Sequence, residues 1–525
     1  MKQKKLSLVL IVCAIVAIGF FLRIYNIDHT PPGIYPDEAV NGEDAIRSNN
    51  TGAYQWYYTA NQGREGLFMN LIAFLFKYFG ASILTLKFPS IFFGTFTILG
   101  TYLLGKELFN SHRTALLAAF FTAVSFWAIN FSRISFRANM LPFVLVFAFY
   151  FLFKGLRTHR KLDFVLGGLF FGLGVHTYIA FRIAPVILII MLLVFCFSRK
   201  RFLATYWPNI LTFIIATLIV ASPMLYTFWK HPEFFESRAD NVSVFSPKIN
   251  GGHPWLMLGR GIFLSLEKYN FVGDMNWRHN YPPYPLLDPL TGIAFLTGLV
   301  LAVLHLLRRA FHHLKRRPYT DPPIDVHIFL LVWFLVMLAP EFLTAEGLPH
   351  ALRSIGTQPA VFLLAAAGAN FLWERADHKP LRTRQALSWI AVVILLFIGV
   401  FNGVKYHYFW ARQEKTATSF NKNVTDIAKV LPSWPLSEEK YVVTSYNTLE
   451  RLPIYVLNEK RPNLTYLYQN ELNKVSPQHP ENFVVFLTGN YADVISQLQQ
   501  RFPQLQLQQV SNPPGSIYYI LSTSN

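Results

Sequence analysis

Charged residues are scarce in this sequence. Only 14% of its 525 residues are Asp, Glu, Lys or Arg, and 53% are hydrophobic, whereas soluble globular proteins carry about 25% charged residues. Lipid-facing surface cannot hold charge, so this composition excludes an ordinary soluble protein and indicates a membrane protein. Length alone would predict roughly three soluble domains, but the membrane composition takes precedence.

Cysteine is nearly absent as well. Cys13 and Cys196 both lie inside apolar runs, so the sequence offers neither a disulfide framework nor a cysteine-based metal site. The C-terminal part of the chain also lacks a Gly-rich phosphate loop, an HExxH motif and a GxSxG motif. That part therefore carries no recognisable catalytic motif.

Long apolar runs, in contrast, are abundant. About eleven of them approach the roughly 20 residues that a helix needs to cross a bilayer. Their limits are near 6–24, 88–105, 114–131, 140–156, 164–180, 182–197, 209–228, 289–307, 327–343, 354–372 and 387–409. The first run lacks a small-x-small cleavage site before Arg23, so we interpret it as an uncleaved span. The run at 66–80 is too short to span, and we expect it to lie in the membrane interface.

The formal net charge of +18 could indicate a nucleic-acid partner. However, Lys and Arg gather in alternate short connections between the predicted spans. These connections lie near residues 2–5, 106–113, 154–161, 199–201, 308–317 and 375–384. The positive-inside rule places such connections in the cytoplasm. The charge thus reflects topology and implies no nucleic acid; it predicts a multi-pass inner (plasma) membrane protein with a cytoplasmic N-terminus and an extracytoplasmic C-terminus.

Three long segments fall on the opposite side, namely 25–87, 229–288 and the tail. Loops of this length are seldom simple connectors. In the tail, β-branched and aromatic runs such as YVVTSY and FVVFLTG alternate with helical patterns, which predicts a small α/β domain. The predicted fold class is an α-helical polytopic membrane protein, with a transmembrane domain over 1–410 and an extracytoplasmic α/β domain over 411–525.

An adjacent carboxylate pair, Asp37 and Glu38, follows the first span in GIYPDEAVNGEDA. One interpretation is a solvated acidic loop that caps a helix. The other is a carboxylate at the bilayer surface, where partial desolvation raises its proton affinity. Such a group suits a general base that acts on a hydroxyl or an amine.

The sequence around this pair resembles a known family. GIYPDEAVNGEDA, followed by GREGLFMNLIAFLFKYFGASILTLKFPSIFFG, looks like the start of lipid-linked sugar transferases of the GT-C fold, which include bacterial aminoarabinose transferases and protein O-mannosyltransferases. Lys87 replaces the more usual Arg in this pattern. Further matches are FSRISFRANMLPF, HTYIAFRIAP, GDMNWRHNYPPYPLLDPLTG and PEFLTAEGLPHALRSIGTQPA. The resemblance extends over residues 6–410.

The resemblance implies a glycosyltransferase. Its donor would be a sugar on a polyprenyl-phosphate carrier, and its acceptor a glycolipid, a protein or a wall glycan outside the cytoplasm. Direct displacement would invert the anomeric carbon. Asp37 would be the base, and Glu38 and Glu65 are the other catalytic candidates. No sugar-nucleotide site is expected, since the sequence shows no Rossmann-like domain on the cytoplasmic side.

Basic side chains on the same predicted face are candidates for the donor phosphate: Arg353, Arg137, Arg133, Arg278 and Arg64. Arg353 is favoured because it precedes a predicted span, and a helix N-terminus attracts anions. For Arg133, contact with lipid headgroups is the alternative. The candidates for other substrate contacts are His350, His279, Tyr178 and Arg182.

The sequence requires no cofactor, but it is compatible with a divalent metal. Some members of the resembled family bind such an ion through a carboxylate and a histidine. Glu65 with His253 or His279 would be the candidate ligands here. Zinc needs three or four converging ligands, which the spacing alone does not establish.

Two other functions remain open. A lipid-sugar flippase or transporter would share the spans and the basic anchors, but it should place its charged site near the bilayer midplane, often within inverted repeats. The sequence shows neither feature. A scaffold whose external domain binds wall polymer is the third interpretation. Release of the lipid phosphate from a donor, in the presence of an acceptor, would distinguish the enzyme from both.

Overall fold

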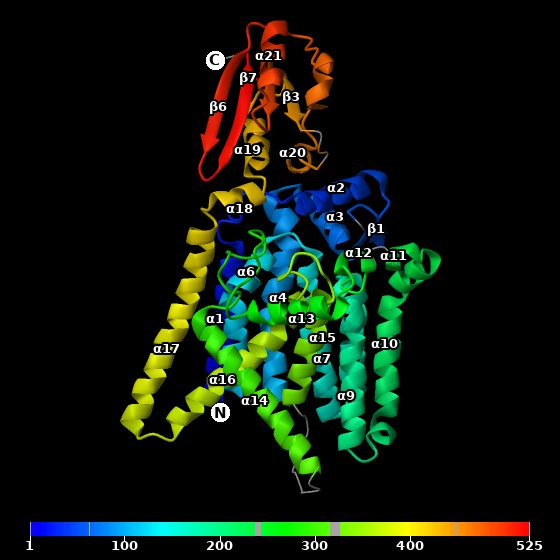
Figure 1. The fold of residues 1–525 in the computed structure, drawn as a ribbon, viewed down its shortest axis with the longest axis vertical. Helices are drawn as coiled ribbons and strands as arrows, with labels where there is room; N and C mark the ends of the chain where they lie inside the picture. Colours follow the sequence, from blue (N-terminus) through cyan, green and yellow to red (C-terminus); the bar gives the residue numbers. More distant parts are fainter. Residues whose placement is uncertain are drawn as a thin grey trace.

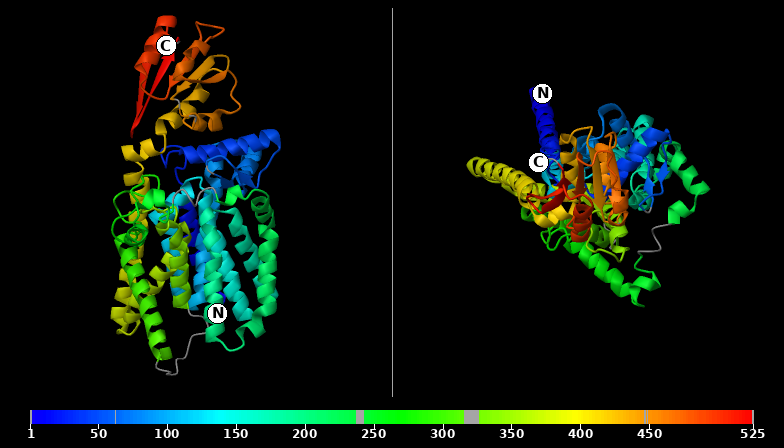
Figure 2. Two further views of the ribbon diagram at one scale, coloured as in Figure 1. Left: turned by 45° about the vertical axis from the view of Figure 1, so that its right-hand side comes forward. Right: turned by 90° about the horizontal axis from the view of Figure 1, so that it is seen from above.

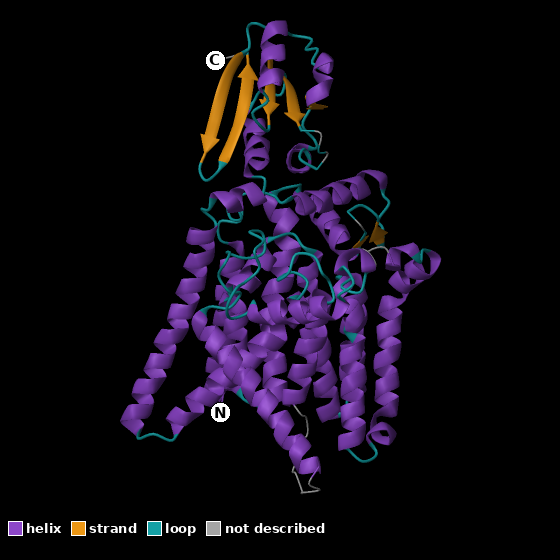
Figure 3. Ribbon diagram, in the orientation of Figure 1, coloured by secondary structure: helices purple, strands orange, loops and turns teal. Residues whose placement is uncertain are grey.

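The structure is a computed structural model that describes residues 2–61, 63–236, 243–314, 326–445, 447 and 449–523. Long helices run along its long axis, and a sheet-containing domain caps one end (Figures 1 and 3). The N-terminal end of the chain lies at the far end from this domain (Figure 2). Three of the basic residues predicted in the cytoplasmic connections, Lys315, Arg316 and Arg317, lie outside the described residues.

Eight helices in the described part of the chain are long and apolar enough to cross a membrane. They are built on α1 (Lys2–Ile24), α4 (Ile83–Phe109), α7 (Met140–Thr158), α9 (Pro185–Ser198), α10 (Phe202–Lys230), α14 (Pro289–Leu314), α16 (Gln358–Asp377) and α17 (Leu381–Val404). A bent pair, α5 (His112–Val124) and α6 (Phe126–Arg133), would make a ninth span.

The two remaining predicted spans correspond to shorter helices. The run near 164–180 folds as α8 (Lys161–Leu173), which has 13 residues, and the run near 327–343 folds as α15 (Val326–Phe342), which has 17. A straight crossing needs about 20 residues. The count of long spans is therefore lower than the sequence predicts, although each predicted run is helical.

Burial separates inner from outer helices. Residues of the α7 span are mostly buried (78%), whereas only 11% of the α17 span is buried. Helix α4 packs against α1, α5 and α7 and lies at the centre of the bundle. Helix α17 stands at the edge (Figure 1), where its apolar residues are left to the lipid.

The pair α5–α6 bends by 53° at Ser125, whose backbone is extended (φ −60°, ψ 131°). The side chain of Asn402, on α17, replaces part of the lost helical pairing. Its Oδ1 accepts a hydrogen bond from the backbone N–H of Phe126 (3.4 Å), and its Nδ2 donates to Asp288 (3.0 Å). Buried backbone groups need such partners in a membrane. The sequence predicted a single span over 114–131 here.

The segment after the first span forms α2 (Pro36–Thr51), a short hairpin of β1 (Tyr57–Tyr58) and β2 (Arg64–Glu65), and α3 (Leu67–Phe79). Helix α2 lies across the upper end of the bundle (Figure 1). Helix α3 has 13 residues and packs on α2 and α4, as expected for a helix too short to span. The second long loop contributes α11 (Glu233–Glu236), α12 (Pro247–Asn250) and α13 (Pro254–Glu267).

The tail folds as the predicted α/β domain. Its sheet has the order β4-β3-β5-β7-β6, in which β3 pairs in parallel with β4 and β5, and β7 pairs antiparallel with β5 and β6. The strands are β3 (Glu439–Thr444), β4 (Leu464–Tyr468), β5 (Phe483–Leu487), β6 (Gln506–Asn512) and β7 (Ser516–Ser522). Helices α19 (Lys422–Val430) and α20 (Leu452–Asn458) pack on one face, and α21 (Ala492–Arg501) covers the other.

The C-terminal domain is joined to the segment that leads into α2. The backbone N–H of Ile34 donates to Thr425 Oγ1 (3.0 Å), and the Lys429 ammonium donates to the carbonyl of Asp28. Helix α20 packs on α2. At Gly42 the two helices come so close that an added Cβ would lie 2.9 Å from both γ-carbons of Val456. The start of α2 is therefore held between the bundle and the C-terminal domain.

Candidate active site

The two adjacent carboxylates at the start of α2 have opposite environments. Glu38 is fully buried: its Oε1 accepts from the Tyr35 N–H (3.0 Å), and its Oε2 accepts from the Ser135 N–H (2.7 Å) and lies 3.7 Å from Lys87 Nζ. Burial raises the pKa of Glu38, and Lys87 opposes this shift. Glu38 thus ties α2 to the bundle, with every oxygen occupied.

Asp37 is only partly buried, and among the described residues it makes no ion pair. Its neighbour is Tyr35, over whose ring the Arg278 guanidinium lies at 4.2 Å. Burial, together with the Asp37 carboxylate, raises the pKa of the Tyr35 phenol to about 12. Asp37 is therefore a carboxylate without a fixed cationic partner, with one arginine within the same small cluster.

Glu65, on the β1–β2 hairpin, faces arginines instead. Its Oε2 accepts from Arg137 Nε at 2.7 Å, and its Oε1 lies 4.0 Å from an Arg182 nitrogen. The Arg137 guanidinium lies 5.6 Å from the centre of the Tyr178 ring. The structure thus brings four predicted site residues together, but Glu65 enters this group as a partner of two cations.

Arg64 is almost fully buried and belongs to a network on α2 that meets the Glu38 contacts at Ser135. It forms an ion pair with Asp44 and donates to Asn41 Oδ1 (2.6 Å). Asn41 in turn donates to the Ser135 carbonyl (2.8 Å). Sequence reasoning missed Asn41 and Asp44. Their i, i+3 spacing, which puts both on one face of a helix, was the available signal.

Arg133 contacts neither the group around Glu65 nor the Arg64 network, and it has no exposed surface. Its guanidinium donates to the backbone carbonyls of Leu22 (3.0 Å), Tyr25 (2.7 Å) and Thr30 (2.6 Å). It therefore stabilises the turn that follows α1. The prediction of a phosphate contact for Arg133 is not supported, because the guanidinium already binds carbonyls and no solvent reaches it.

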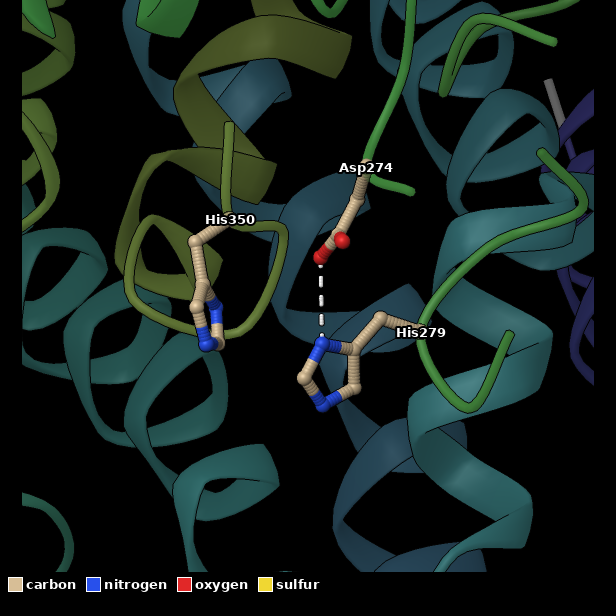
Figure 4. Close-up of side chains that lie close together, drawn as sticks. All are labelled: Asp274, His279 and His350. Carbon is tan, nitrogen blue, oxygen red and sulfur yellow. Dashed lines mark hydrogen bonds and ion pairs between the residues drawn. The ribbon is translucent and has the colours of Figure 1, made fainter. Parts of the chain in front are cut away.

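Besides the group around Asp37 and the group around Glu65, a third cluster is formed by Asp274, His279 and His350. It joins the second long loop to the connection between α15 and α16. Asp274 Oδ2 accepts from His279 Nδ1 (3.0 Å) and from the Ala351 N–H (2.8 Å), and the rings of His279 and His350 lie 4.9 Å apart (Figure 4). Burial would raise the pKa of Asp274, but His279, His350 and the Ala351 N–H together lower it on balance. Burial, and then His279, lower the pKa of His350 well below its usual value.

This cluster changes the predicted ligand set. The carboxylate beside His279 is Asp274, whereas Glu65 contacts arginines. His253, the other histidine considered, is exposed at the start of α13. Within the described residues, Asp274, His279 and His350 are the group of ligand-type side chains that converge. Sequence reasoning named both histidines and missed Asp274, which stands five positions before His279.

The third cluster lies beside the Asp37 region. The ring of Phe136 is 6.4 Å from that of His279 and 5.8 Å from that of Tyr35. Arg278 precedes His279, and Arg353, which is half-buried, follows His350 on its loop. Arg353 donates to the carbonyl of Glu346. It lies just before the short turn η4 (Ile355–Thr357) and α16.

Two cavities adjoin α2. One, of about 840 Å³, is lined by the aromatic group Trp56, Tyr57 and Tyr58 and by Arg47 and Lys230. The other, of about 470 Å³, begins at Pro36, beside Asp37, and is lined mainly by polar residues of the C-terminal domain. The hairpin cavity therefore lies at the C-terminal end of α2, whereas the cavity of the C-terminal domain lies at its start, next to Asp37.

Residues 67–227 match a family model described as dolichyl-phosphate-mannose-protein mannosyltransferase. The comparison with curated protein sequences gave no match. The structure of ArnT from Cupriavidus metallidurans bound to undecaprenyl phosphate is similar over 98% of both chains, with a TM-score of 0.52 and 12% identity. Its apo form is similar over 99% of this chain and 98% of the other, with a TM-score of 0.53 and 13% identity.

The archaeal oligosaccharyltransferase AglB from Archaeoglobus fulgidus, in complex with an inhibitory peptide and a dolichol-phosphate, is also similar. The TM-score is 0.51 at 16% identity over 88% of this chain, which spans 65% of the length of AglB. These findings confirm the predicted fold class, a GT-C membrane fold with a small C-terminal sheet domain. They also confirm the resemblance to lipid-linked sugar transferases.

Proposed function

We propose that this protein transfers a sugar from a polyprenyl-phosphate carrier to an acceptor outside the cytoplasm, with inversion at the anomeric carbon. The observation that carries the proposal is the contrast at the start of α2, where Glu38 is buried in an ion pair and Asp37 is left without one. The family match and the solved structures that hold undecaprenyl phosphate or dolichol-phosphate support this donor class.

The proposed step is a direct displacement. Asp37 accepts the proton of an acceptor hydroxyl or amine, whose oxygen or nitrogen forms a bond to the anomeric carbon. The bond between that carbon and the phosphate oxygen breaks, and the polyprenyl phosphate leaves with the electron pair. General-base assistance of this kind accelerates reactions by about 10²–10⁴-fold.

Arginines near Asp37 suit the leaving phosphate. Arg278 lies over Tyr35, and Arg353 is half-buried on the neighbouring loop. A guanidinium can bind two phosphate oxygens at once, so either would stabilise the charge that develops on the leaving group. Arg137 and Arg182 already surround Glu65, which favours a role in shaping the hairpin wall of the site.

The membrane arrangement forms part of this proposal. We place the protein in the inner (plasma) membrane, with its N-terminus in the cytoplasm and its C-terminus outside. The chain would divide into a transmembrane domain over 1–410 and an extracytoplasmic domain over 411–525. In this arrangement α2, the hairpin and the three clusters all lie on the outer side. The acceptor, whether glycolipid, protein or wall glycan, would approach from there.

The test is a donor-to-acceptor assay with purified protein in nanodiscs. Undecaprenyl-phosphate donors that carry a pentose, a hexose or an amino sugar are each offered with envelope glycolipid, protein and glycan fractions. Released undecaprenyl phosphate and labelled acceptor are both measured. Asp37→Asn should lower turnover by about 10²–10⁴-fold and leave donor binding nearly unchanged, because the substitution preserves size and hydrogen bonding.

The matched control is Glu43→Gln, which removes another partly buried carboxylate from the same helix. It should retain turnover. Near-native turnover in Asp37→Asn would reject Asp37 as the base and return it to a helix start on a solvated loop. Movement of intact donor across the membrane, with no lipid phosphate released, would favour the flippase interpretation instead.

A further inference from the structure

We propose that Asp274, His279 and His350 bind one divalent transition-metal ion, for which zinc is the best match. The proposal does not depend on the transferase reaction. It concerns a site that joins two extracytoplasmic loops, one between α13 and α14 and the other between α15 and α16.

The first argument is convergence. One potential ligand atom from each of the three side chains lies within 4.8 Å of the other two. Figure 4 shows Asp274 and His279, which come from one loop, beside His350, which comes from the other. Asp274 and His279 are buried, and His350 is half-buried. Buried ligand-type side chains drawn together from two loops suit a small ion better than an exposed acidic patch does.

The second argument is an unused nitrogen. His350 Nδ1 is buried and has no hydrogen-bond partner among the described residues. Leaving a buried polar atom unpaired costs about 1–3 kcal/mol, so native structures rarely keep one without a purpose. A lone pair on an imidazole nitrogen is the donor that zinc prefers.

The third argument is that hydrogen bonds already hold the other two ligands, Asp274 and His279, in position. His279 Nδ1 and Asp274 Oδ2 share a hydrogen bond at 3.0 Å. A metal ion would take the place of the proton between these two atoms. The Asp274 carboxylate is oriented by the backbone N–H groups of Asn276 (2.8 Å) and Ala351 (2.8 Å). Such supporting hydrogen bonds are typical around metal ligands and fix their direction.

The chemical type of the three ligands indicates the class of metal ion. Two imidazoles with one carboxylate suit zinc and its transition-metal neighbours. Calcium and magnesium bind almost entirely through oxygen ligands, which this cluster supplies only once. With three protein ligands, a zinc ion would keep a fourth position open.

Metal binding would also fix the spacing of two arginines. Arg278 precedes one ligand, and Arg353 follows another by three positions. Without the ion, the two loops are joined by hydrogen bonds to Asp274 and by the buried ion pair of Lys268 with Glu341, which also accepts from the His350 N–H (2.9 Å). The ion would add a direct link between them.

The experiment uses the full-length protein, purified in detergent, stripped with a chelator and dialysed against zinc chloride. Bound metal is measured by mass spectrometry, and thermal unfolding is followed at increasing zinc concentration. We expect one zinc per chain and a Tm that rises with zinc, since a ligand that binds only the folded state stabilises it. Magnesium chloride at the same concentrations should leave Tm unchanged.

Variants connect the metal to these residues. His350→Gln and Asp274→Asn should each weaken zinc binding by at least about 10²-fold, more than the loss of a supporting group alone. His253→Gln, which removes an exposed histidine at the start of α13, should bind zinc as the parent does. The stripped variants are first compared with the stripped parent by thermal unfolding, and His279→Gln replaces any variant that does not fold.

Absence of bound zinc in the parent would overturn the proposal. Zinc binding that survives in His350→Gln, Asp274→Asn and His279→Gln would overturn it as well, because the metal would then be held elsewhere. The Asp274–His279 pair would in either case be a hydrogen bond within one loop, and the Ala351 N–H would link that loop to the other.

Discussion

Asp37 and Glu38 are adjacent in the chain but differ in burial and in ion pairing. Successive residues at a helix start point in different directions, so Glu38 enters the bundle and meets Lys87, while Asp37 stays at the surface. Lys87 is fully buried, and its ammonium also donates to the Gly33 carbonyl (3.2 Å). The pair Glu38–Lys87 therefore holds the start of α2 on the bundle, and Asp37 makes no ion pair among the described residues.

This difference leads to a prediction about stability. Glu38→Gln should lower the free energy of unfolding by about 3 kcal/mol, because it leaves the Lys87 charge buried without its partner. Thermal unfolding in detergent measures the change. Asp37→Asn, which breaks no ion pair, should unfold like the parent.

A double variant separates charge from packing. Adding Lys87→Met to Glu38→Gln removes the unpaired charge, so much of the lost stability should return. If Glu38→Gln unfolds at the same temperature as the parent, the ion pair is not important for stability, and Glu38 becomes free to serve as the catalytic candidate considered from the sequence.

At the scale of elements, α2 depends on α20. The two helices meet at Gly42, where no side chain separates them from Val456. Gly42→Ala places a methyl group 2.9 Å from both γ-carbons of Val456, which is too close, so the helices must move apart. We expect faster proteolysis of the C-terminal domain and lower activity, since the first turn of α2 carries Asp37.

Val456→Ala is the matching second change. Alone it should leave a small cavity, but combined with Gly42→Ala it removes the carbons that clash. Protection from protease in the double variant should therefore exceed that in Gly42→Ala, a coupling expected only for residues in contact. Additive effects would show that the two helices do not pack as the structure has them.

The sequence predicted elements well where one physical signal dominates. Apolar length located each helix of the bundle, and β-branched runs located four of the five strands of the tail. Strand β6 was missed because its residues, QLQQVSN, are mostly polar and exposed at the sheet edge. Only pairing with β7 makes it a strand. The bend at Ser125 was missed because Asn402, which supports it, is 276 positions away from Phe126 in the chain.

Site residues were harder to assign, because a charged side chain near a span has several uses. SRISFR contains two arginines, of which Arg133 binds buried carbonyls and Arg137 binds Glu65. Nothing local distinguishes them, since the partners come from other helices and loops. Asp274 was missed for the same reason: its significance depends on His350, which lies on a different loop.

For the whole molecule, the prediction concerns orientation. A reporter that is active only outside the cytoplasm should work when fused after Asn525, and a reporter active in the cytoplasm should work when fused after Arg201. The reason is that basic residues of the short connections stay on the cytoplasmic side. A C-terminal fusion active in the cytoplasm would reverse the bundle and place α2 and its carboxylates on the wrong side.

The contact between Ile34 and Thr425 joins residues that are 391 positions apart. At about 5–20 residues per second of synthesis, the second partner follows the first by roughly 20–80 s. Throughout that interval the segment leading into Asp37 can contact Lys87 and Ser135 of the bundle but not the C-terminal domain. The contacts around the start of α2 are therefore completed last, and a ribosome that stalls before residue 425 leaves a bundle whose α2 lacks its C-terminal partners.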